Sequence, residues 1–325
     1  MIKTTSKQLL TSEYFIKITK EDLEKKIEEM ISDKQIISIL EGGKRLRALL
    51  AILTFKACTL GNETSEQYQK ALEGGVVIEL AHAASLVHDD IIDGDAKRRG
   101  KTSYHIKNGV ANALLTGHKM LVKGFNVAIK HGEEWAKLYA NSWNEIINGE
   151  LDEMELNKNG FNMDDDNTRL KVFEIYNKVI NLKTAALFSS VCKAGAIEAK
   201  TSGDILKVFA DYGREIGMAY QLADDLVDLA NGEMIDSVII PLLNKLGDKT
   251  NNKINSLKKM SIKRKFAKNK DEIEKIYLDE IKKHIEKAEI LSASDLIPKS
   301  QYKDLIAEFP RYIINEMLKE IKISI

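Results

Sequence analysis

The stretch Leu86-Val87-His88-Asp89-Asp90-Ile91-Ile92-Asp93 places three carboxylates within five residues of an apolar, alanine-rich segment. If this stretch is helical, Asp89 and Asp93 lie one turn apart on the same face. Two like charges at about 5–6 Å destabilise a helix, and a hard divalent cation bound by both carboxylates would offset that repulsion. The same D-D-x-x-D spacing returns at Asp224-Asp225-Leu226-Val227-Asp228, again in apolar surroundings.

The composition indicates a helical protein without a charge bias. The 325 residues include 49 basic and 49 acidic side chains, so the formal net charge is zero, which argues against a general nucleic-acid binder or a membrane-surface binder. Only three prolines occur, and Leu, Ile, Lys, Glu and Ala are abundant, which predicts a mostly helical chain. We expect one all-helical domain over residues 1–325, in which residues 249–325 could form a C-terminal helical lobe.

The chain carries no sign of export or of a membrane span. Residues 1–10 lack a sustained apolar region, and the longest apolar stretches, at 74–80 and 235–243, fall well short of the ~20 residues that cross a bilayer. We therefore expect a soluble, cytoplasmic protein without stable membrane insertion. Cys58 and Cys192 lie far apart in apolar surroundings, which favours free thiols in a reducing compartment over a disulfide.

Apolar residues at three- and four-residue spacing predict a series of helices. We expect helices over residues 17–40, 65–93, 110–130, 168–197 and 204–230, with Gly42-Gly43 separating the first from a helix that begins at Lys44.

The basic turn Lys44-Arg45-Leu46-Arg47 has two interpretations. Basic side chains in the first turn of a helix oppose the helix dipole, so the turn could be a solvated surface feature. Alternatively, Lys44 and Arg47, at positions i and i+3, reach the same way and form an anion site together with the amide groups of the helix N-terminus.

The pair Glu79 and His82 has the Glu-x-x-His spacing of di-iron bundles, but those need a second such pair and this sequence has none. A lone helical histidine is by default a hydrogen-bonded core residue. His82 nevertheless lies two turns from Asp89 and near the same face, so a substrate-facing role stays open.

Three further basic residues could bind phosphate. Gly94 to Thr102 resembles a Walker A loop, but it has five residues between its glycines where four are required and it follows a helix, so we reject that interpretation. The adjacent Arg98 and Arg99 remain, and arginine suits bidentate phosphate contacts. Lys183 precedes an apolar run and is either a surface residue with a buried stem or a phosphate-facing lysine.

These parts together favour one class of substrate. Two carboxylate clusters imply two or more Mg²⁺ ions, which bind through one or two carboxylates plus water and substrate phosphates. Lys44, Arg47, Arg98, Arg99 and Lys183 provide more cationic groups than one monophosphate requires. No Ser-His-Asp set, cysteine nucleophile, zinc spacing or dinucleotide fingerprint is present. Apolar helices between the clusters would enclose an apolar cavity, which suits a diphosphate with a hydrocarbon tail.

Over roughly residues 40–230 the chain resembles the trans-isoprenyl diphosphate synthases, the polyprenyl synthetase family. Five motifs occur in the family's order. They are Gly42-Gly43-Lys44-Arg45-Leu46-Arg47 for G-G-K-R-x-R, Glu79, His82 and Leu86–Asp93 for E-x-x-H…L-x-H-D-D-x-x-D, Arg98-Arg99-Gly100 for R-R-G, Lys183-Thr184 for K-T, and Gln221–Asp228 for Q-x-x-D-D-x-x-D.

The resemblance implies a fold, an activity and a set of site residues. The fold would be all-α, a single large helical bundle of the isoprenoid synthase type around a central apolar cavity. The activity would be Mg²⁺-dependent condensation of isopentenyl diphosphate with an allylic diphosphate, with three ions bound by Asp89, Asp93 and Asp224 and with Asp228 behind Asp224. Arg98, Lys183, Thr184 and Gln221 would hold the allylic diphosphate, and Lys44, Arg47, His82 and Arg99 would hold isopentenyl diphosphate. Asp89, Asp93, Lys183 and Asp224 would be the catalytic residues.

The resemblance also bears on product length and assembly. In the family, bulky residues four and five positions before the first acidic motif form the floor of the cavity. Here these are Ser85 and Ala84, and Ala81 one turn earlier is also small. This argues against a C15 product and favours C20, geranylgeranyl diphosphate, made from dimethylallyl, geranyl or farnesyl diphosphate. The floor could instead lie at Ile78 or on the helix of Phe125. A homodimer is expected.

Three alternatives remain open. The first is a synthase of longer chains, of C25 or more. The second is a class I terpene cyclase, but its second metal motif expects Ser or Thr at position 228 and Glu at 232, where this chain has Asp228 and Gly232. The third is a catalytically weak partner subunit. The family's lysine-containing stretch after the second motif is replaced by Leu229–Ser237, and the nearest lysine, Lys245, is out of register.

Overall fold

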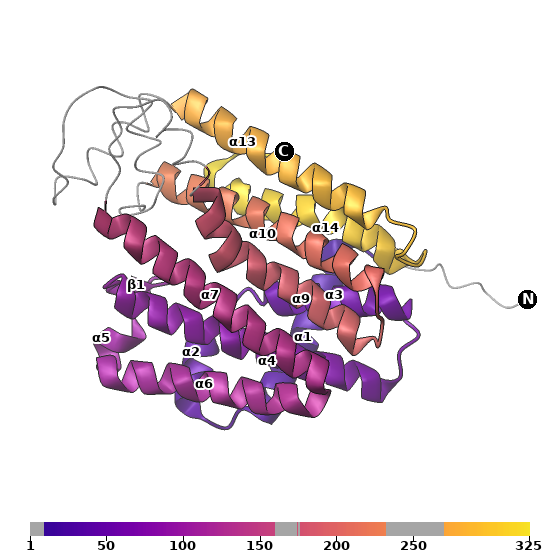
Figure 1. Ribbon diagram of the computed structural model, residues 1–325, viewed down its shortest axis with the longest axis horizontal. Helices are drawn as coiled ribbons and strands as arrows, with labels where there is room; N and C mark the ends of the chain where they lie inside the picture. The colour runs from indigo at the N-terminus through magenta and orange to yellow at the C-terminus, as the bar shows by residue number, and fades with distance from the viewer. Residues whose placement is uncertain (1–9, 160–173, 175, 232–269) are drawn as a thin grey trace, which may run out of the picture. The chain divides into compact units, whose positions relative to one another are not determined.

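A computed structural model describes residues 10–159, 174, 176–231 and 270–325 of the chain. This part of the chain is helical, apart from two paired strands of two residues each, β1 (Lys97–Arg98) and β2 (Lys101–Thr102) (Figure 1). The predicted all-α class is confirmed. None of the described helices combines the length and the hydrophobicity that crossing a bilayer requires.

The helices have the following bounds. In order they are α1 (Ser12–Met30), α2 (Lys34–Leu40), α3 (Leu46–Thr59), α4 (Ser65–Ile92), α5 (Tyr104–Asn108), α6 (Val110–His131), α7 (Glu133–Asn159), the π-helix η1 (Asn181–Ala185), α9 (Ala186–Glu198), α10 (Asp204–Asn231), α13 (Lys270–Ser292), α14 (Gln301–Leu318) and the 3₁₀ turn η2 (Lys319–Ile321).

The chain forms two compact units. Unit 1 comprises Met1–Ala140, Val191–Lys207 and Asp295–Ile306, and unit 2 comprises Asn141–Ser190, Val208–Ser294 and Ala307–Ile325. The expectation of a single domain over residues 1–325 stays a prediction. Residues 249–269 of the expected C-terminal lobe and residues 168–173 of the helix expected over 168–197 lie outside the described residues.

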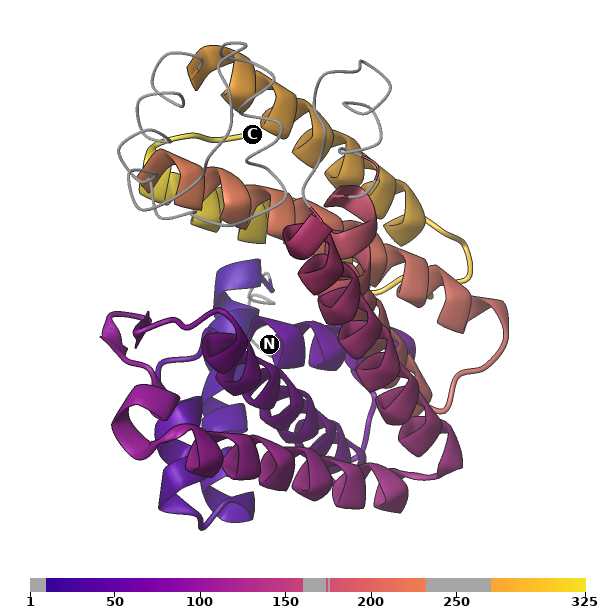
Figure 2. The ribbon, with the colours of Figure 1, turned by 60° about the vertical axis from the view of Figure 1, so that its left-hand side comes forward.

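Helix α4 is the centre of unit 1, where it contacts α1, α2, α3, α5 and α6 (Figure 2). Its start is fixed by a capping box. The Thr64 hydroxyl accepts a hydrogen bond from the Gln67 amide at 3.2 Å, and the Gln67 side chain accepts one from the Thr64 amide at 2.7 Å. Small residues such as Gly74, Gly75 and Ala84 let neighbouring helices pack closely around it. The helix predicted over 65–93 is confirmed.

Unit 2 contains α13 and most of α10 and α14, which run beside one another in both views (Figures 1 and 2). His284 of α13 contacts Glu215 of α10 at 2.5 Å, and Arg311 of α14 donates to Glu289 of α13 at 3.0 Å. The helices predicted over 110–130 and 204–230 are confirmed as α6 and α10.

Two predicted helix boundaries near the N-terminus are wrong. The expected helix over 17–40 is broken after Met30, because the Asp33 side chain accepts hydrogen bonds from the Gln35 amide at 2.9 Å and the Ile36 amide at 3.4 Å and so caps a new helix, α2. The next helix begins at Leu46 rather than Lys44. Arg45 has a left-handed backbone, with φ of 60°, so Lys44 stands before the helix.

The free thiols predicted from sequence are confirmed. Neither Cys58 nor Cys192 forms a disulfide. Burial raises the pKa of the Cys58 thiol to about 12, although a hydrogen bond with Thr201 opposes this, and burial likewise raises the pKa of Cys192. Both thiols are therefore protonated at neutral pH.

Helix α6 is apolar on two sides. Its buried side packs against α4 and carries the small residues Ala113, Gly117, Gly124 and Ala128. Its opposite side, which we call the outer face, carries Leu114, Leu115, Val122, Phe125 and Ile129, all of them exposed, with Leu115 reaching 69%. Five exposed apolar side chains on one face of a helix are typical of a surface that another molecule covers.

We expect Gly195→Ala to destabilise the protein by about 1–3 kcal/mol, because overpacking of a tight core has that cost. A Cβ atom at Gly195 of α9 would stand 2.1 Å from the Ala51 carbonyl oxygen of α3, and a backbone atom cannot move aside as a flexible side chain can. Urea denaturation followed by circular dichroism measures this.

The matched control is Gly75→Ala in α4, where the nearest atom would be the flexible Leu23 Cδ1 at 3.1 Å. This change should be neutral or stabilising, since alanine favours a helix more than glycine does. Equal stability of both variants would contradict the close approach of α9 to α3.

Candidate functional site

In unit 1, the first acidic motif stands at the C-terminal end of α4. Asp89 is half-buried and Asp93 is exposed. The Asp93 amide donates to the Asp89 carbonyl oxygen at 2.8 Å, so the helical register continues to Asp93 and the predicted i, i+4 relation is confirmed. The end of a helix carries partial negative charge, and the last turn of α4 contains no basic residue. Carboxylates there are unfavourable unless cations are supplied from elsewhere.

The middle residue of the motif, Asp90, receives such a cation from the protein itself. Its side chain is buried, and its Oδ1 lies 2.5 Å from both Nε and Nη2 of Arg98. Arg98 belongs to β1 of a hairpin whose turn is Arg99-Gly100, and both turn residues have positive φ, as a type I′ turn requires. The hairpin thus directs Arg98 to Asp90 and leaves Arg99 exposed at its tip.

A cluster of arginines surrounds His82, which is half-buried on α4. Nη1 of Arg47 lies 3.1 Å from Nε2 of His82, and because arginine can only donate, the imidazole nitrogen accepts. Burial lowers the pKa of His82 well below its usual range, and the positive charges of Arg47, Arg99, Arg98 and Arg45 lower it further. His82 is therefore neutral at pH 7, in a positive field that suits an anion. For Arg47, this contact favours the anion-site interpretation of the basic turn.

The remaining predicted residues of unit 1 differ in exposure. Lys44 is exposed, and because it precedes α3, its expected i, i+3 relation with Arg47 on one helix is wrong. Among the small residues expected to control product length, Ala81 and Ala84 are buried, while Ser85 is half-buried and donates its hydroxyl to the His82 carbonyl oxygen at 2.8 Å.

In unit 2, the second acidic motif occupies the last two turns of α10, a helix that also has no basic residue in its last turn. Asp224 and Asp228 are half-buried, whereas the middle residue, Asp225, is buried. Asp225 accepts hydrogen bonds from the Gln221 amide at 2.9 Å and from the Tyr176 hydroxyl. Burial raises the pKa of Asp225 to about 7, and these two hydrogen bonds oppose that rise.

The predicted phosphate ligands Thr184 and Gln221 lie together in the same unit. The Thr184 hydroxyl donates to Gln221 Oε1 at 2.7 Å, so a chain of hydrogen bonds runs from Thr184 through Gln221 to Asp225. Sequence reasoning missed Tyr176, which also bonds Asp225, because its position in the sequence says nothing of its distance from α10.

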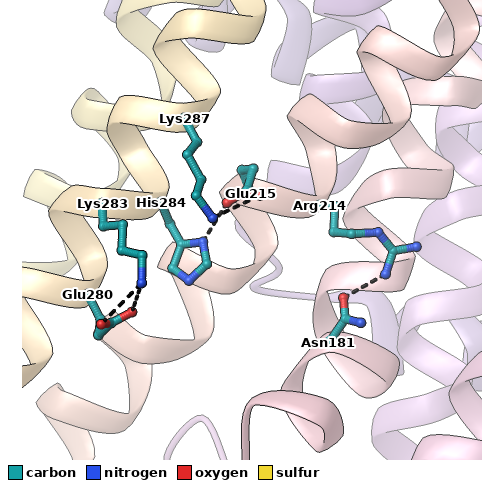
Figure 3. Close-up of polar contacts among 7 residues, drawn as sticks. All are labelled: Asn181, Arg214, Glu215, Glu280, Lys283, His284 and Lys287. Carbon is teal, nitrogen blue, oxygen red and sulfur yellow. Dashed lines mark hydrogen bonds and ion pairs between the residues drawn. The ribbon is translucent and has the colours of Figure 1, made fainter. Parts of the chain in front are cut away.

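Lys183 and Thr184 lie in the π-helix η1, and π-helical turns are frequent at functional sites. Besides the hydrogen bond from Thr184 to Gln221, two further contacts with α10 hold this segment. Arg214 donates to the Asn181 side chain at 2.6 Å (Figure 3), and Gly217 allows so close an approach that a Cβ there would lie 2.6 Å from the Ala185 Cα.

The Lys183 ammonium group lies between two carboxylates of α7. Its Nζ is 2.6 Å from Glu150 and also contacts Glu153. Burial would lower the pKa of Lys183, but the charges and hydrogen bonds of Glu153 and Glu150 raise it above its ordinary value. Neither of our two interpretations of this lysine anticipated these partners. The i, i+3 spacing of Glu150 and Glu153 on one helix face was the available signal.

The carboxylates of the two acidic motifs suit a cation that takes only some of its ligands from the protein. Among the described residues, no group of three or more His, Cys, Asp or Glu side chains could hold a metal ion. Mg²⁺ does not require such a cage, because it keeps several waters and takes one or two carboxylates plus substrate phosphates. The outer aspartates of each motif, Asp89 with Asp93 and Asp224 with Asp228, have the i, i+4 spacing for that role.

We expect the stability of the protein to fall as the pH drops below about 6.5, the ordinary pKa of histidine, in part because of His82. Its pKa is depressed in the folded protein, so the unfolded chain binds more protons there and stability rises with pH. Urea denaturation between about pH 5 and 7.5 measures the slope. His82→Gln should flatten this slope. An equal slope in wild type and His82→Gln would show that His82 is not held neutral.

Known proteins resemble this chain in sequence and in fold. The family model for polyprenyl synthetase matches residues 28–294. A geranylgeranyl diphosphate synthase of Methanosarcina mazei is 31% identical over 201 residues, which are 60% of this chain and 57% of that protein. An octaprenyl diphosphate synthase of Escherichia coli is 32% identical over 217 residues, which are 64% of this chain and 62% of that protein. The chain thus matches less than two thirds of the length of these two relatives.

The fold also matches a solved structure over nearly its whole length. A polyprenyl synthase from Caulobacter crescentus, in complex with calcium and isoprenyl diphosphate, superposes with a TM-score of 0.75 over 95% of this chain and 99% of that chain, at 21% identity. This likeness shows the all-α isoprenoid synthase fold. Because the family match covers most of the 325 residues, the resemblance inferred from the five motifs is confirmed, and the chain belongs to the polyprenyl synthetase family.

Proposed function

We propose that this chain is a trans-prenyltransferase that condenses isopentenyl diphosphate with an allylic diphosphate into a linear prenyl diphosphate, the C20 geranylgeranyl diphosphate. The observation that carries the proposal lies on α4. This helix presents outer aspartates at its C-terminal end and, two turns earlier, a neutral imidazole surrounded by arginines. Such an element offers ligands for a divalent cation and cationic donors for a diphosphate.

Each unit contributes a group of proposed ligands. In unit 1, isopentenyl diphosphate is bound by Lys44, Arg47, His82 and Arg99. The allylic diphosphate is bound by Arg98, and Asp90 orients the Arg98 side chain. In unit 2, Lys183, Thr184 and Gln221 bind the allylic diphosphate. Asp89, Asp93 and Asp224, with Asp228 behind, bind three Mg²⁺ ions. Bound Mg²⁺ would supply the positive charge that stabilises the leaving diphosphate.

The reaction then follows from charge stabilisation. Cationic side chains around the allylic diphosphate lower the barrier for cleavage of its C–O bond, since preorganised positive groups favour the charge that develops on the leaving oxygen. The π electrons of isopentenyl diphosphate form the new C–C bond at the allylic carbon. A proton leaves the condensed product and is taken up by the departing diphosphate, which restores a double bond. Exclusion of water protects the cationic carbon until that bond forms.

Two groups of residues support the proposed product length and assembly. Ser85 is half-buried and small, so the growing hydrocarbon chain can pass it, which supports C20 rather than C15. The names of the relatives refer to geranylgeranyl and to octaprenyl diphosphate, so an experiment must choose between a C20 product and a longer one. The outer face of α6 supports a homodimer, because a second copy of the chain would cover its exposed leucines, valine, phenylalanine and isoleucine.

A turnover assay tests the proposed activity, and Asp89→Ala tests the metal assignment. Wild-type protein incubated with Mg²⁺, isopentenyl diphosphate and farnesyl diphosphate should yield a linear prenyl diphosphate, detected by mass spectrometry. Asp89→Ala should lose turnover by at least about 100-fold, a loss of roughly 2.7 kcal/mol of barrier stabilisation, with its circular dichroism unchanged, because Asp89 is not buried.

The same assay separates the alternatives. A hydrocarbon product would indicate a terpene cyclase. Absence of turnover with every allylic primer would indicate a partner subunit that needs another chain. Full activity of Asp89→Ala would refute its role as a metal ligand.

We expect Ser85→Phe to shorten the product to C15 or less, because a phenyl ring at this half-buried position would block the path of the hydrocarbon chain. Ser85→Ala is the matched control. It removes the hydrogen bond to the His82 carbonyl oxygen but keeps the side chain small, so product length should not change. Chromatography of the dephosphorylated products measures this. An unchanged product length in Ser85→Phe would place the floor elsewhere.

A further inference from the structure

The three basic residues of the turn before α3 have different surroundings. Lys44 is exposed and Arg47 is half-buried, whereas Arg45 between them is buried, with its side chain only 4% exposed. A buried guanidinium needs partners for its donors, because an unpaired buried charge is strongly unfavourable. The middle arginine therefore has a role in the fold that the other two do not share.

Two carboxylates from two different helices hold Arg45. Its Nε and Nη2 donate to Glu24 of α1 at 2.9 and 3.2 Å, and its Nη1 donates to Glu79 of α4 at 3.2 Å. Glu79 is as buried as Arg45, while the Glu24 side chain is 41% exposed. Burial raises the pKa of Glu79, and the charge and hydrogen bond of Arg45 oppose that rise. This contact ties the start of α3 to the middle of α4.

The backbone around Arg45 is built to permit this contact. Arg45 itself has a left-handed conformation, with φ of 60°, which is unfavourable for a residue other than glycine. Its guanidinium folds back over Gly43, where a Cβ atom would stand 2.4 Å from Nη1 of Arg45. The turn thus accepts a strained residue and requires a glycine so that the guanidinium can reach Glu79. Such strain persists only where surrounding contacts compensate for it.

The same two segments carry the proposed anion ligands. Arg47 follows Arg45 by two residues, and His82 follows Glu79 by three, one turn along α4. The Arg47–His82 contact of 3.1 Å therefore lies directly beside the Arg45–Glu79 contact of 3.2 Å. Moving the turn relative to α4 would move Lys44 and Arg47 relative to His82.

We propose that Arg45 and Glu79 form a positioning pair that holds Lys44 and Arg47 in place beside His82, so that these residues can bind the diphosphate of isopentenyl diphosphate. The inference rests on the proposed function of this site. Arg45 does not touch substrate in this arrangement, because its donors are directed to Glu24 and Glu79. Its contribution is geometric, and displacements near 1 Å in a binding site can cost about 100-fold in rate.

The experiment compares three variants with wild type: Arg45→Met, Glu79→Gln and the double variant Arg45→Met/Glu79→Leu. The double variant matters because replacing a buried ion pair with apolar residues is often neutral for stability, whereas removing one partner leaves a buried charge. We measure kcat, the KM for isopentenyl diphosphate and the KM for farnesyl diphosphate. Calorimetry measures the Kd of isopentenyl diphosphate alone, which does not depend on turnover.

The matched control is Glu63→Gln, which breaks a half-buried ion pair in unit 1. Lys56 near the C-terminal end of α3 contacts Glu63, and the two side chains are 15% and 6% exposed. This pair joins α3 to the segment before α4 but lies far along α3 from Arg47. The control should therefore lose stability without a change in the KM or the Kd for isopentenyl diphosphate.

We expect all three variants to raise the KM and the Kd for isopentenyl diphosphate by ~10-fold, equal to about 1.4 kcal/mol of binding, with kcat and the KM for farnesyl diphosphate within about twofold of wild type. If the double variant regains stability but still binds isopentenyl diphosphate weakly, the Arg45–Glu79 pair positions the ligands rather than serving folding in general.

Two results would overturn the inference. One is a Kd for isopentenyl diphosphate within twofold of wild type in the folded Glu79→Gln and double variants. The other is a large loss in Arg45→Met with none in Glu79→Gln, which would make Arg45 a direct ligand. Wild-type protein that binds isopentenyl diphosphate without turnover would instead refute the proposed function alone.

Discussion

Negative charge at the C-terminal ends of α4 and α10 is the constraint on which the site depends. Three aspartates stand at each end, where the helix dipole is already negative and the last turn contains no basic residue. The protein offsets part of this charge by itself. Arg98 neutralises Asp90, and hydrogen bonds from Gln221 and Tyr176 support Asp225. What remains at the outer aspartates is a negative field that divalent cations are suited to balance.

Residues within one motif therefore serve different purposes. In both acidic motifs the middle aspartate is buried and has protein partners, while the outer two are more accessible. The basic turn repeats this division, since Arg45 is buried against Glu79 while Lys44 and Arg47 are not. Lys183 is a third case, because Glu150 and Glu153 compete with any phosphate for its ammonium group. Each short motif thus combines buried residues that hold the fold together with accessible residues that could bind a ligand.

Much of the fold followed from local sequence patterns. Helices α4, α6 and α10 were predicted from apolar spacing, and the i, i+4 relation of Asp89 and Asp93 was correct because α4 keeps its register to its last residue. The division of labour within the motifs was not predictable from spacing. It depends on Tyr176, Glu24 and Glu150, whose contacts join residues far apart in the chain.

The prediction errors have equally local causes. The helix expected over 17–40 was broken because a capping aspartate, Asp33, outweighed a continuous apolar pattern. The hairpin at Lys97–Thr102 was missed because its strands are two residues long and carry no alternation of polar and apolar side chains. The dipeptide Arg99-Gly100 could have indicated the hairpin turn, in which both residues adopt positive φ.

The burial of Asp90 and Asp225 has a consequence for how such a protein changes over evolutionary time. Helices α4 and α10 each bury the middle aspartate within their own unit and leave the outer ones, Asp89 and Asp93 or Asp224 and Asp228, more exposed. Substitutions at the outer positions would leave the helices assembled. A duplicated gene could therefore lose its chemistry by drift and still encode a folded chain, available for retention as a scaffold or as a regulator of an active copy.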